Sequence, residues 1–298
     1  MIQQIPCLSQ DNHGGFCYYK SMLRNILVVN DDGIDALGVH KLAEALSEAG
    51  NVYVCSPHTQ QSATGHGITI GKLVIVEDVD FPEAIKAVSM EGTPADCVKI
   101  GLEHYRNKGV EIDMVFSGFN HGMNLGTDTL YSGTVSAALE GAICGLPSAA
   151  ISISSPNSFH RTPDNYEAAM SIASQIAKSE MFSDLIAKNP RNLDINFIHE
   201  EHVILSVNVP DLPAKEIKGV KVCPLSYRVY DEWFREKTSE DGRAGYHYSG
   251  SPKVIGEADP DESDIAANKH GYATVTPLCF DLTNREALSA WRGFDWKI

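Results

Sequence analysis

The chain of 298 residues is poor in positive charge and has no long apolar run. It carries 24 Lys and Arg against 39 Asp and Glu, a formal net charge of −15. Such a surface repels a nucleic-acid backbone and no basic run offsets it, so we expect no polymeric nucleic acid as a partner. No apolar stretch reaches the roughly 18 to 20 residues that span a bilayer, and we expect no membrane partner.

Paired cysteine motifs and a signal peptide are also missing. The seven cysteines are odd in number and form no C-x-x-C pair, which favours reduced thiols over disulfides or a zinc site and predicts a cytoplasmic protein. Residues 1–21 are polar, without the apolar core of a signal peptide. Because Met22 stands just ahead of the first predicted strand, we interpret residues 1–21 as a disordered extension or start-site artefact.

Two common catalytic signatures are absent as well. The first predicted strand ends in N-D-D-G rather than G-x-G-x-x-G, which disfavours a dinucleotide-dependent oxidoreductase. No Ser-His-Asp or Cys-His arrangement points to a nucleophilic enzyme.

The most informative stretch present is Ile26 to Gly33, I-L-V-V-N-D-D-G. The apolar run reads as a strand buried on both faces, and Asp31 and Asp32 follow where a parallel sheet opens into a crevice. At the turn before Gly33 both carboxylates can converge on one point, and a hard divalent cation relieves their repulsion. The competing interpretation is an exposed turn that caps the next helix.

Strand and helix patterns alternate through most of the chain. Strands are expected at 26–29, 52–55, 113–117, 149–153, 203–209 and 272–277, helices at 36–49, 94–106, 131–145, 166–178 and 285–291, short strands or a hairpin within 68–90, and a connector at 183–202. Repeated β-α-β units predict an α/β fold whose strand-end loops share one edge.

Two further loops should reach that edge. The loop at 56–67 offers Ser62 and Thr64 for phosphate or metal contact, although such loops are also ordinary connectors, and His58 and His66 are expected to be exposed. The loop at 118–128 carries Asn120 and Asn124.

A helix N-terminus follows the second of these loops. It starts at Ser132, Gly133 and Thr134, whose free amides and hydroxyls suit a phosphate. The alternative role for its small residues is close packing on the sheet.

Residues 224–270 change character, with six Tyr, Trp and Phe residues scattered among charges and few aliphatics. An arm of this composition usually packs on a partner subunit or on the main domain.

Three blocks together resemble the SurE survival-protein family of metal-dependent 5′/3′-nucleotidases. They are I-L-V-V-N-D-D-G at 26–33, S-A-T-G-H-G-I-T at 62–69 with G-T-P-A-D-C-V-K at 92–99, and the segment from Ser117 to Gly141, which contains S-G-F-N-H-G-M-N-L-G and Y-S-G-T. Their order and spacing make the resemblance specific over about residues 22–290.

The resemblance implies that Asp31, Asp32, Ser62 and Asn120 bind one divalent metal per subunit, Mg²⁺ or Mn²⁺. It also implies a Rossmann-like three-layer fold at 22–298, with a β-rich arm at 224–270 that is exchanged or packed in a homodimer or homotetramer. The substrates would be nucleoside monophosphates, with other phosphate esters left open.

In the expected mechanism, metal-activated water attacks phosphorus and Asp31 or Asp32 accepts its proton. The phosphate oxygens would be held by Asn30, Asn124, Ser132, Gly133 and Thr134. The chain departs from the family at Ser56-Pro57-His58, usually Ala-Pro-Asp, and at Gln61, often basic, which affects substrate preference rather than the ligands. The alternative function is a non-catalytic nucleotide-binding sensor, which would not need two carboxylates aimed at a phosphate.

Overall fold

The computed structural model describes residues 24–154, 162–184, 203–231, 234–248, 251–254, 263–294 and 296. The predicted extension at 1–21 and most of the predicted connector at 183–202 lie outside these residues.

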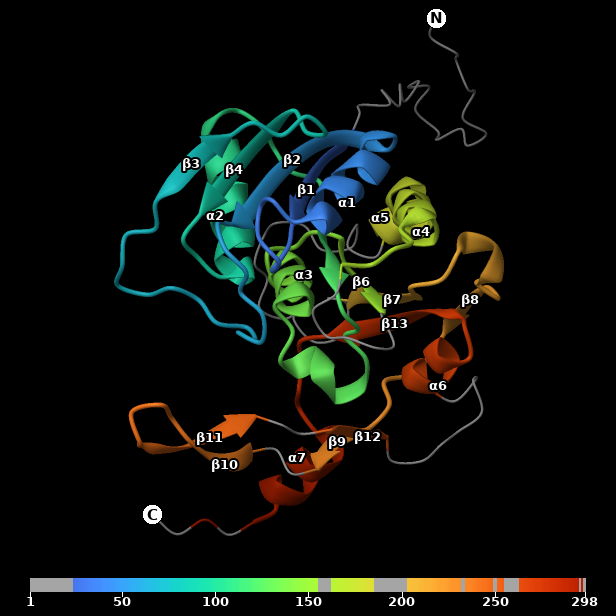
Figure 1. Cartoon of the computed structure of the whole chain (residues 1–298). Coiled ribbons are helices and arrows are strands. Elements are labelled where there is room, and N and C mark those ends of the chain that lie inside the picture. Colours follow the sequence, from blue (N-terminus) through green and yellow to red (C-terminus); the bar gives the residue numbers. More distant parts are fainter. Residues whose placement is uncertain are drawn as a thin grey trace, which may run out of the picture.

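A nine-stranded sheet forms the centre of the molecule (Figure 1), in the order β3-β4-β2-β1-β5-β6-β7-β13-β8. Its strands are β1 (Arg24–Val29), β2 (Gly50–Pro57), β3 (Val76–Val79), β4 (Lys86–Met90), β5 (Met114–His121), β6 (Ser148–Ser154), β7 (Val203–Pro210), β8 (Val220–Val222) and β13 (Ala273–Cys279). The strands from β4 to β7 are parallel, whereas β3 pairs antiparallel with β4 and β13 antiparallel with β7.

Helices cover both faces of the sheet, which confirms the predicted α/β class. The α-helices are α1 (Leu37–Ser47), α2 (Pro94–Asn107), α3 (Gly133–Ile143), α4 (Glu167–Lys178), α5 (Glu180–Asp184), α6 (Asp264–Lys269) and α7 (Arg285–Arg292), and two 3₁₀ helices are η1 (Gly126–Leu130) and η3 (Ala214–Glu216). One apolar cluster joins the sheet to α1, α4 and α5, and another joins it to α2 and α3. No helix in the described ranges is long and apolar enough to cross a membrane.

The start of α2 shows how local sequence fixes these elements. The Thr93 hydroxyl accepts a hydrogen bond from the Asp96 amide (3.1 Å), and the Asp96 carboxylate accepts one from the Thr93 amide (2.9 Å). With Pro94 in the first turn, this reciprocal cap confirms the helix start predicted at residue 94.

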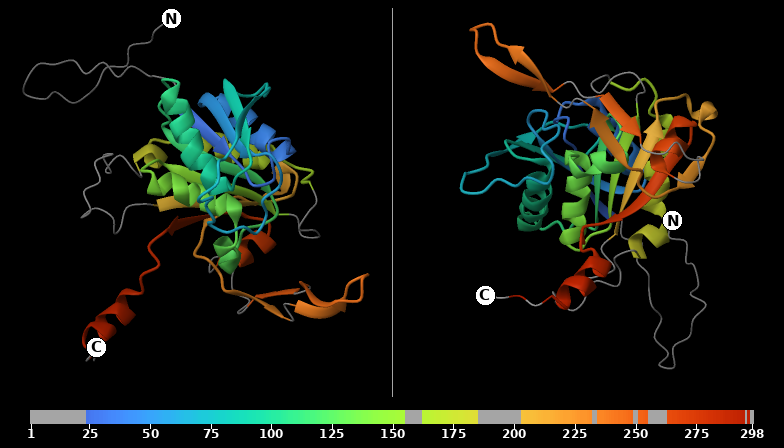
Figure 2. Two further views of the ribbon diagram at one scale, coloured as in Figure 1. Left: turned by 90° about the vertical axis from the view of Figure 1, so that its left-hand side faces the viewer. Right: turned by 90° about the horizontal axis from the view of Figure 1, so that it is seen from below.

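The predicted β-rich arm is present and extends from the body. It contains β9 (Arg228–Asp231), β10 (Phe234–Thr238), β11 (Ala244–Tyr248) and β12 (Ser251–Val254), which pair antiparallel as β10–β11 and β12–β9. Figure 2 shows the β10–β11 hairpin projecting away from the body in both views, and α7 leaving it separately.

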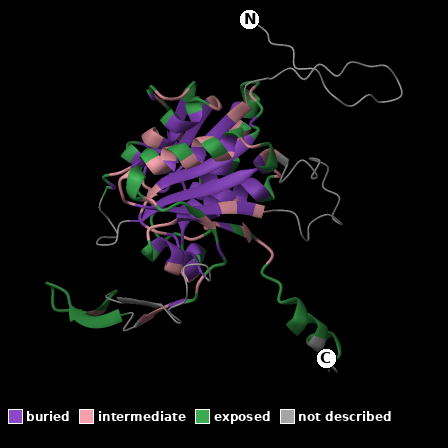
Figure 3. Cartoon of the chain, turned by 90° about the vertical axis from the view of Figure 1, so that its right-hand side faces the viewer, coloured by how far each residue is buried: buried purple, intermediate pink, exposed green. Residues whose placement is uncertain are grey.

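Burial separates this arm from the core. The central strands are buried, whereas the hairpin and α7 are exposed (Figure 3). Helix α6 also lies within the predicted arm range, but unlike the hairpin it packs on the body. Its Ile265 and Ala267 are buried, and the Asn268 side chain donates a hydrogen bond to the Asn208 carbonyl of β7 (3.3 Å). The last part of that range therefore packs on the body.

Candidate functional site

The candidate site lies at the edge where parallel strands end. β1 leads directly into Asn30, Asp31 and Asp32, β2 leads into the loop that carries Ser62, and Asn120 stands near the end of β5. Because β1 is flanked by β2 and β5 in parallel register, these three segments meet at one edge.

Asp31 is almost fully buried, and its carboxylate faces the start of α3. Its Oδ1 accepts a hydrogen bond from the Thr134 hydroxyl at 2.6 Å. Burial and the neighbouring charge of Asp32 raise the pKa of Asp31 to about 7, although the bond from Thr134 acts in the opposite direction. A positive ion at this position would stabilise the buried charge of Asp31 and offset its repulsion by Asp32.

Asp32 is fixed by the next loops along the edge. Its Oδ1 accepts a bond from the Gln60 amide (3.2 Å), and its Oδ2 accepts one from the His121 backbone amide (2.9 Å). Neither Asp caps α1: its N-cap is Ala36, which makes no side-chain cap bond. The interpretation of Asp31 and Asp32 as a helix-capping turn is therefore wrong.

Ser62 and Asn120 lie beside this pair through their chain neighbours. The Gln61 amide donates to the Asp31 carbonyl (2.7 Å), which brings the loop to β1 one residue before the exposed Ser62. Asn120 directly precedes His121, and its side-chain nitrogen donates to the Gly122 carbonyl (2.9 Å).

The five predicted phosphate contacts divide into two groups. Asn30 and Gly133 lie directly at Asp31: the Asn30 side chain donates to Gly33 (2.9 Å), and a Cβ on Gly133 would lie 3.0 Å from the Asp31 carboxylate. The other three are engaged within the fold. Thr134 supports Asp31, Ser132 caps α3 by accepting from the Val135 amide (3.0 Å), and Asn124 donates to Ser152 (2.9 Å).

The sequence did not predict two residues that surround Asp32, His121 and Tyr166. The ring of His121 is joined to the Tyr166 hydroxyl by a hydrogen bond (3.0 Å), and its Nδ1 lies 3.9 Å from Asp32. Burial lowers the pKa of His121 despite the nearby carboxylate. The position of His121 directly after Asn120 was the available signal, whereas Tyr166 directly precedes α4 and is distant in sequence.

The donor set is suited to a hard divalent cation. The predicted ligands Asp31, Asp32, Ser62 and Asn120 all present oxygen, the chemistry that Mg²⁺ and Mn²⁺ favour. The Asn30 side-chain oxygen is buried and accepts no hydrogen bond within the described structure, so the site has a further unsatisfied acceptor. The described residues contain no group of three or more His, Cys, Asp or Glu that could hold a metal; the predicted set has two carboxylates.

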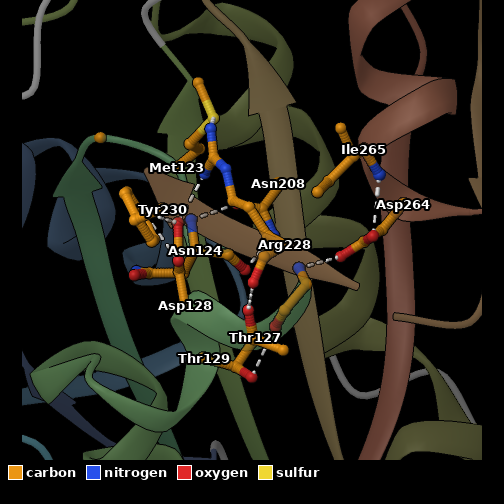
Figure 4. A network of polar contacts seen from close by, with 12 residues as sticks. Met123, Asn124, Thr127, Asp128, Thr129, Asn208, Arg228, Tyr230, Asp264 and Ile265 are labelled. Carbon is orange, nitrogen blue, oxygen red and sulfur yellow. Dashed lines mark hydrogen bonds and ion pairs between the residues drawn. The ribbon is translucent and has the colours of Figure 1, made fainter. Parts of the chain in front are cut away.

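A polar network ties the loop after β5 to the arm (Figure 4). Asp128 accepts bonds from the Arg228 guanidinium (2.5 Å) and the Tyr230 hydroxyl (2.7 Å). Asp264, at the start of α6, accepts bonds from the amides of Gly126 (2.7 Å) and Ser226 (2.8 Å). The segment leading to the N-terminus of α3 is thus fastened to the base of the arm.

Taken together, the fold and the site define a Rossmann-like α/β protein with a carboxylate pair facing a helix N-terminus. A family model described as "Survival protein SurE" matches residues 26–232, and the chain belongs to the SurE family.

Individual relatives agree with this assignment. The chain is 40% identical to "5′-nucleotidase SurE" of Fervidobacterium nodosum, over 90% of this chain and 96% of the relative, and 41% identical to the protein of the same name from Alkaliphilus metalliredigens, over 87% and 94%. It is also similar to the crystal structure of the SurE protein from Aquifex aeolicus, with a TM-score of 0.70, 33% identity, and coverage of 89% of this chain and 97% of that one.

Proposed function

We propose that the chain is a divalent-metal-dependent phosphomonoesterase that hydrolyses nucleoside 5′- and 3′-monophosphates to nucleoside and phosphate. The observation that carries the proposal is the adjacent carboxylate pair at the end of β1, with the buried Asp31 touching the first turn of α3. Two carboxylates facing a helix N-terminus repel a phosphate unless a cation lies between them. The family relatives named 5′-nucleotidase SurE point to the same activity.

The metal would be held by Asp31, Asp32, Ser62 and Asn120, one ion per subunit, with Mg²⁺ and Mn²⁺ as the candidates. Such an ion supplies a Lewis acid and lowers the pKa of a bound water. The chain itself supplies the orientation of the ligands. Thr134 holds the Asp31 carboxylate by its hydroxyl, and the His121 amide and Gln60 hold Asp32. Asp31 or Asp32 accepts the proton from the attacking water.

The phosphate would lie at the N-terminus of α3. The first backbone amides of this helix, at Gly133 and Thr134, have no carbonyl partner within the helix. The Thr134 amide lies within hydrogen-bond reach of the Asp31 carboxylate. The absence of a side chain at Gly133 keeps this approach open, since a Cβ there would press on Asp31. Asn30, Asn124 and Ser132 complete the proposed phosphate contacts.

The wider context is proposed on the same basis. The substrates are nucleoside monophosphates and other phosphate esters, the location is the cytoplasm, and the assembly is a homodimer or homotetramer formed through the arm at 224–270. Exposed aromatic side chains on the hairpin, Phe234, Tyr246 and Tyr248, support such an assembly, because large exposed aromatics are typical of subunit interfaces.

The test is phosphate release from 5′-AMP and 3′-AMP by the purified chain with Mn²⁺, with Mg²⁺ and with EDTA. We expect turnover with at least one of the ions and none in EDTA. Asp32→Asn removes one charge from the pair and should lower kcat/KM by at least about 100-fold, as loss of a metal-binding carboxylate does.

Asp35→Asn is the matched control. Asp35 is an exposed carboxylate in the same turn, and its replacement should leave activity within about twofold of the wild-type value. Binding of AMP without phosphate release in either ion would overturn the catalytic proposal.

A further inference from the structure

A second carboxylate lies on α3, away from the site described above. Glu140 is buried, with 5% of its side chain exposed, and binds two partners from different elements. Its Oε2 accepts a hydrogen bond from His66 Nε2 at 2.8 Å, and its Oε1 accepts one from Lys99 Nζ at 2.5 Å. One carboxylate thus joins α3, α2 and the loop that carries Ser62.

The charge state of this cluster follows from its contacts. Burial opposes ionisation of Glu140, but the hydrogen bonds from His66 and Lys99 outweigh it and keep the pKa of the carboxyl below its ordinary value. Glu140 is therefore ionised and acts only as an acceptor. It follows that Nε2 of His66 carries the hydrogen of the bond between them.

The loop that contains His66 is fixed at its near end by the active-site carboxylates. Gln60 donates to the Asp32 side chain (3.2 Å), and the Gln61 amide donates to the Asp31 carbonyl (2.7 Å). Immediately after these bonds the chain turns through Ser62 and Ala63, and Ala63 has a φ of +58°. This backbone conformation is uncommon for a residue with a side chain and is retained only where neighbouring contacts hold it.

The far end of the loop is fixed to the helices. The Thr93 hydroxyl at the start of α2 donates to the Gly67 carbonyl (2.7 Å), and the His66 side chain reaches Glu140 of α3. Ser62 lies between the two fixed ends and is itself exposed. The bond between His66 and Glu140 is thus a side-chain contact between the Ser62 loop and the helix whose first turn holds Asp31.

We propose that His66 and Glu140 are positioning residues for the metal site: by fastening the Ser62 loop to α3, they set the distance between Ser62 and Asp31. One helix then holds two of the proposed ligands, Asp31 through Thr134 and the Ser62 loop through Glu140. This inference rests on the proposed function, because it takes Ser62 to be a ligand. Neither residue touches the substrate or the metal.

The test measures Mn²⁺ binding to the full chain without substrate, by isothermal titration calorimetry and by the electron paramagnetic resonance signal of free Mn²⁺. His66→Ala should raise the Kd for Mn²⁺ roughly tenfold, the effect of losing one hydrogen bond to a charged group. His66→Gln keeps an N–H donor and should return the Kd to within about threefold of the wild-type value. At saturating Mn²⁺, kcat for 5′-AMP should stay within about twofold for both variants, because the tether affects occupancy of the site.

Lys99→Met is the matched control, because it shows whether weaker Mn²⁺ binding follows from any loss of a bond to Glu140 or only from loss of the bond to the Ser62 loop. Lys99 binds the same carboxylate at 2.5 Å but belongs to α2 rather than to the Ser62 loop. It should leave the Kd for Mn²⁺ within about twofold, even where thermal unfolding shows a loss of stability similar to that of His66→Ala.

The outcomes separate the two proposals. An unchanged Kd in His66→Ala, or equal weakening by His66→Ala and Lys99→Met, would overturn the positioning role while the wild-type chain still binds Mn²⁺ and releases phosphate. A wild-type chain that neither binds Mn²⁺ nor releases phosphate would overturn the proposed function, and the positioning role with it.

Discussion

The buried carboxyl of Asp31 makes stability depend on pH in the metal-free protein. Its pKa is about 7 in the folded state, compared with an ordinary value of 3.8. Between these values the folded chain keeps a proton that the unfolded chain has released, so each rise in pH favours the unfolded chain and lowers stability until the folded carboxyl also ionises near pH 7. We expect the free energy of unfolding in EDTA to fall by about 2 to 4 kcal/mol between pH 4 and pH 7 through this residue.

Urea unfolding at several pH values in EDTA measures this decline, and Asp31→Asn isolates it. The variant has no carboxyl to titrate at this position and should lose that part of the slope, while carboxyl groups other than its neighbour Asp32 contribute equally to both proteins. Adding Mn²⁺ to the wild-type chain should remove the decline above pH 6, because a cation favours the charged carboxylate. Parallel curves for wild type and Asp31→Asn in EDTA would show that Asp31 is ionised throughout.

The position of the carboxylate pair in the fold could be predicted from the sequence because it depends on local chemistry. Asp31 and Asp32 follow a buried strand, and the structure brings both to the sheet edge with the Ser62 loop and Asn120 alongside. Thr134 shows the limit: it was predicted as a phosphate contact, yet its hydroxyl bonds to Asp31. Which way that hydroxyl points depends on how closely α3 approaches β1, a tertiary relation that no spacing along the chain encodes.

At the scale of elements, the contact between α1 and β5 leaves no room for a side chain at Gly38. A Cβ there would clash with the Phe119 carbonyl oxygen, and the neighbouring His121 ring lies 3.0 Å from the same point. Gly38→Ala must therefore move α1 or the end of β5. We expect a net loss of roughly 2 kcal/mol in unfolding free energy, since overpacking exceeds the gain in helix propensity.

Thermal or urea unfolding tests this substitution, and Gly245→Ala serves as its control. Gly245 lies in the exposed β11 strand, where an added Cβ would come no closer than 3.8 Å to Lys237. Its replacement should change stability by less than about 0.5 kcal/mol. Because Asn120 and His121 belong to the displaced segment, Gly38→Ala should also lower kcat/KM, and full retention of both stability and activity would contradict the predicted clash.

Most elements followed from periodicity and caps, since buried strands and amphipathic helices carry their patterns locally. The short strands or hairpin predicted within 68–90 are present as the antiparallel pair β3–β4. The pair begins only at Val76, however, and the apolar Ile70 and Leu73 before it are 80% and 86% exposed. An alternating apolar pattern would give a strand one apolar face, but the pattern does not determine whether another segment of the chain packs on that face. The sequence pattern also could not predict that β13 pairs antiparallel with β7, because the two strands are distant in sequence.

The described residues expose two aromatic surfaces that suit subunit contacts. One is the arm hairpin, and the other is the cluster of Trp291, Phe294 and Trp296 around α7, in which the two Trp rings stack at 5.6 Å. We expect a dimer or tetramer at micromolar concentration. Replacing Trp291 and Phe294 by Ser should shift the population toward the monomer in sedimentation velocity, because these side chains would lose their partner contacts.

Met181→Ser is the comparison for that experiment. Met181 is 78% exposed on α5, away from both aromatic surfaces, and its replacement should leave the assembly unchanged. A wild-type chain that sediments as a monomer at these concentrations would contradict the expected assembly.

The place of β13 in the sheet also bears on how the protein is made. β13 lies between β7 and β8, although residues 211–272 separate it from β7 in sequence. At about 5 to 20 residues per second on the ribosome, roughly 3 to 12 s pass between synthesis of β7 and arrival of its neighbour. During that interval the β7 edge that pairs with β13 has no partner strand, and the aromatic arm emerges while that edge is still open. The nascent chain is therefore most vulnerable to misassociation after the strands from β1 to β7 have been synthesised and before β13 pairs with β7.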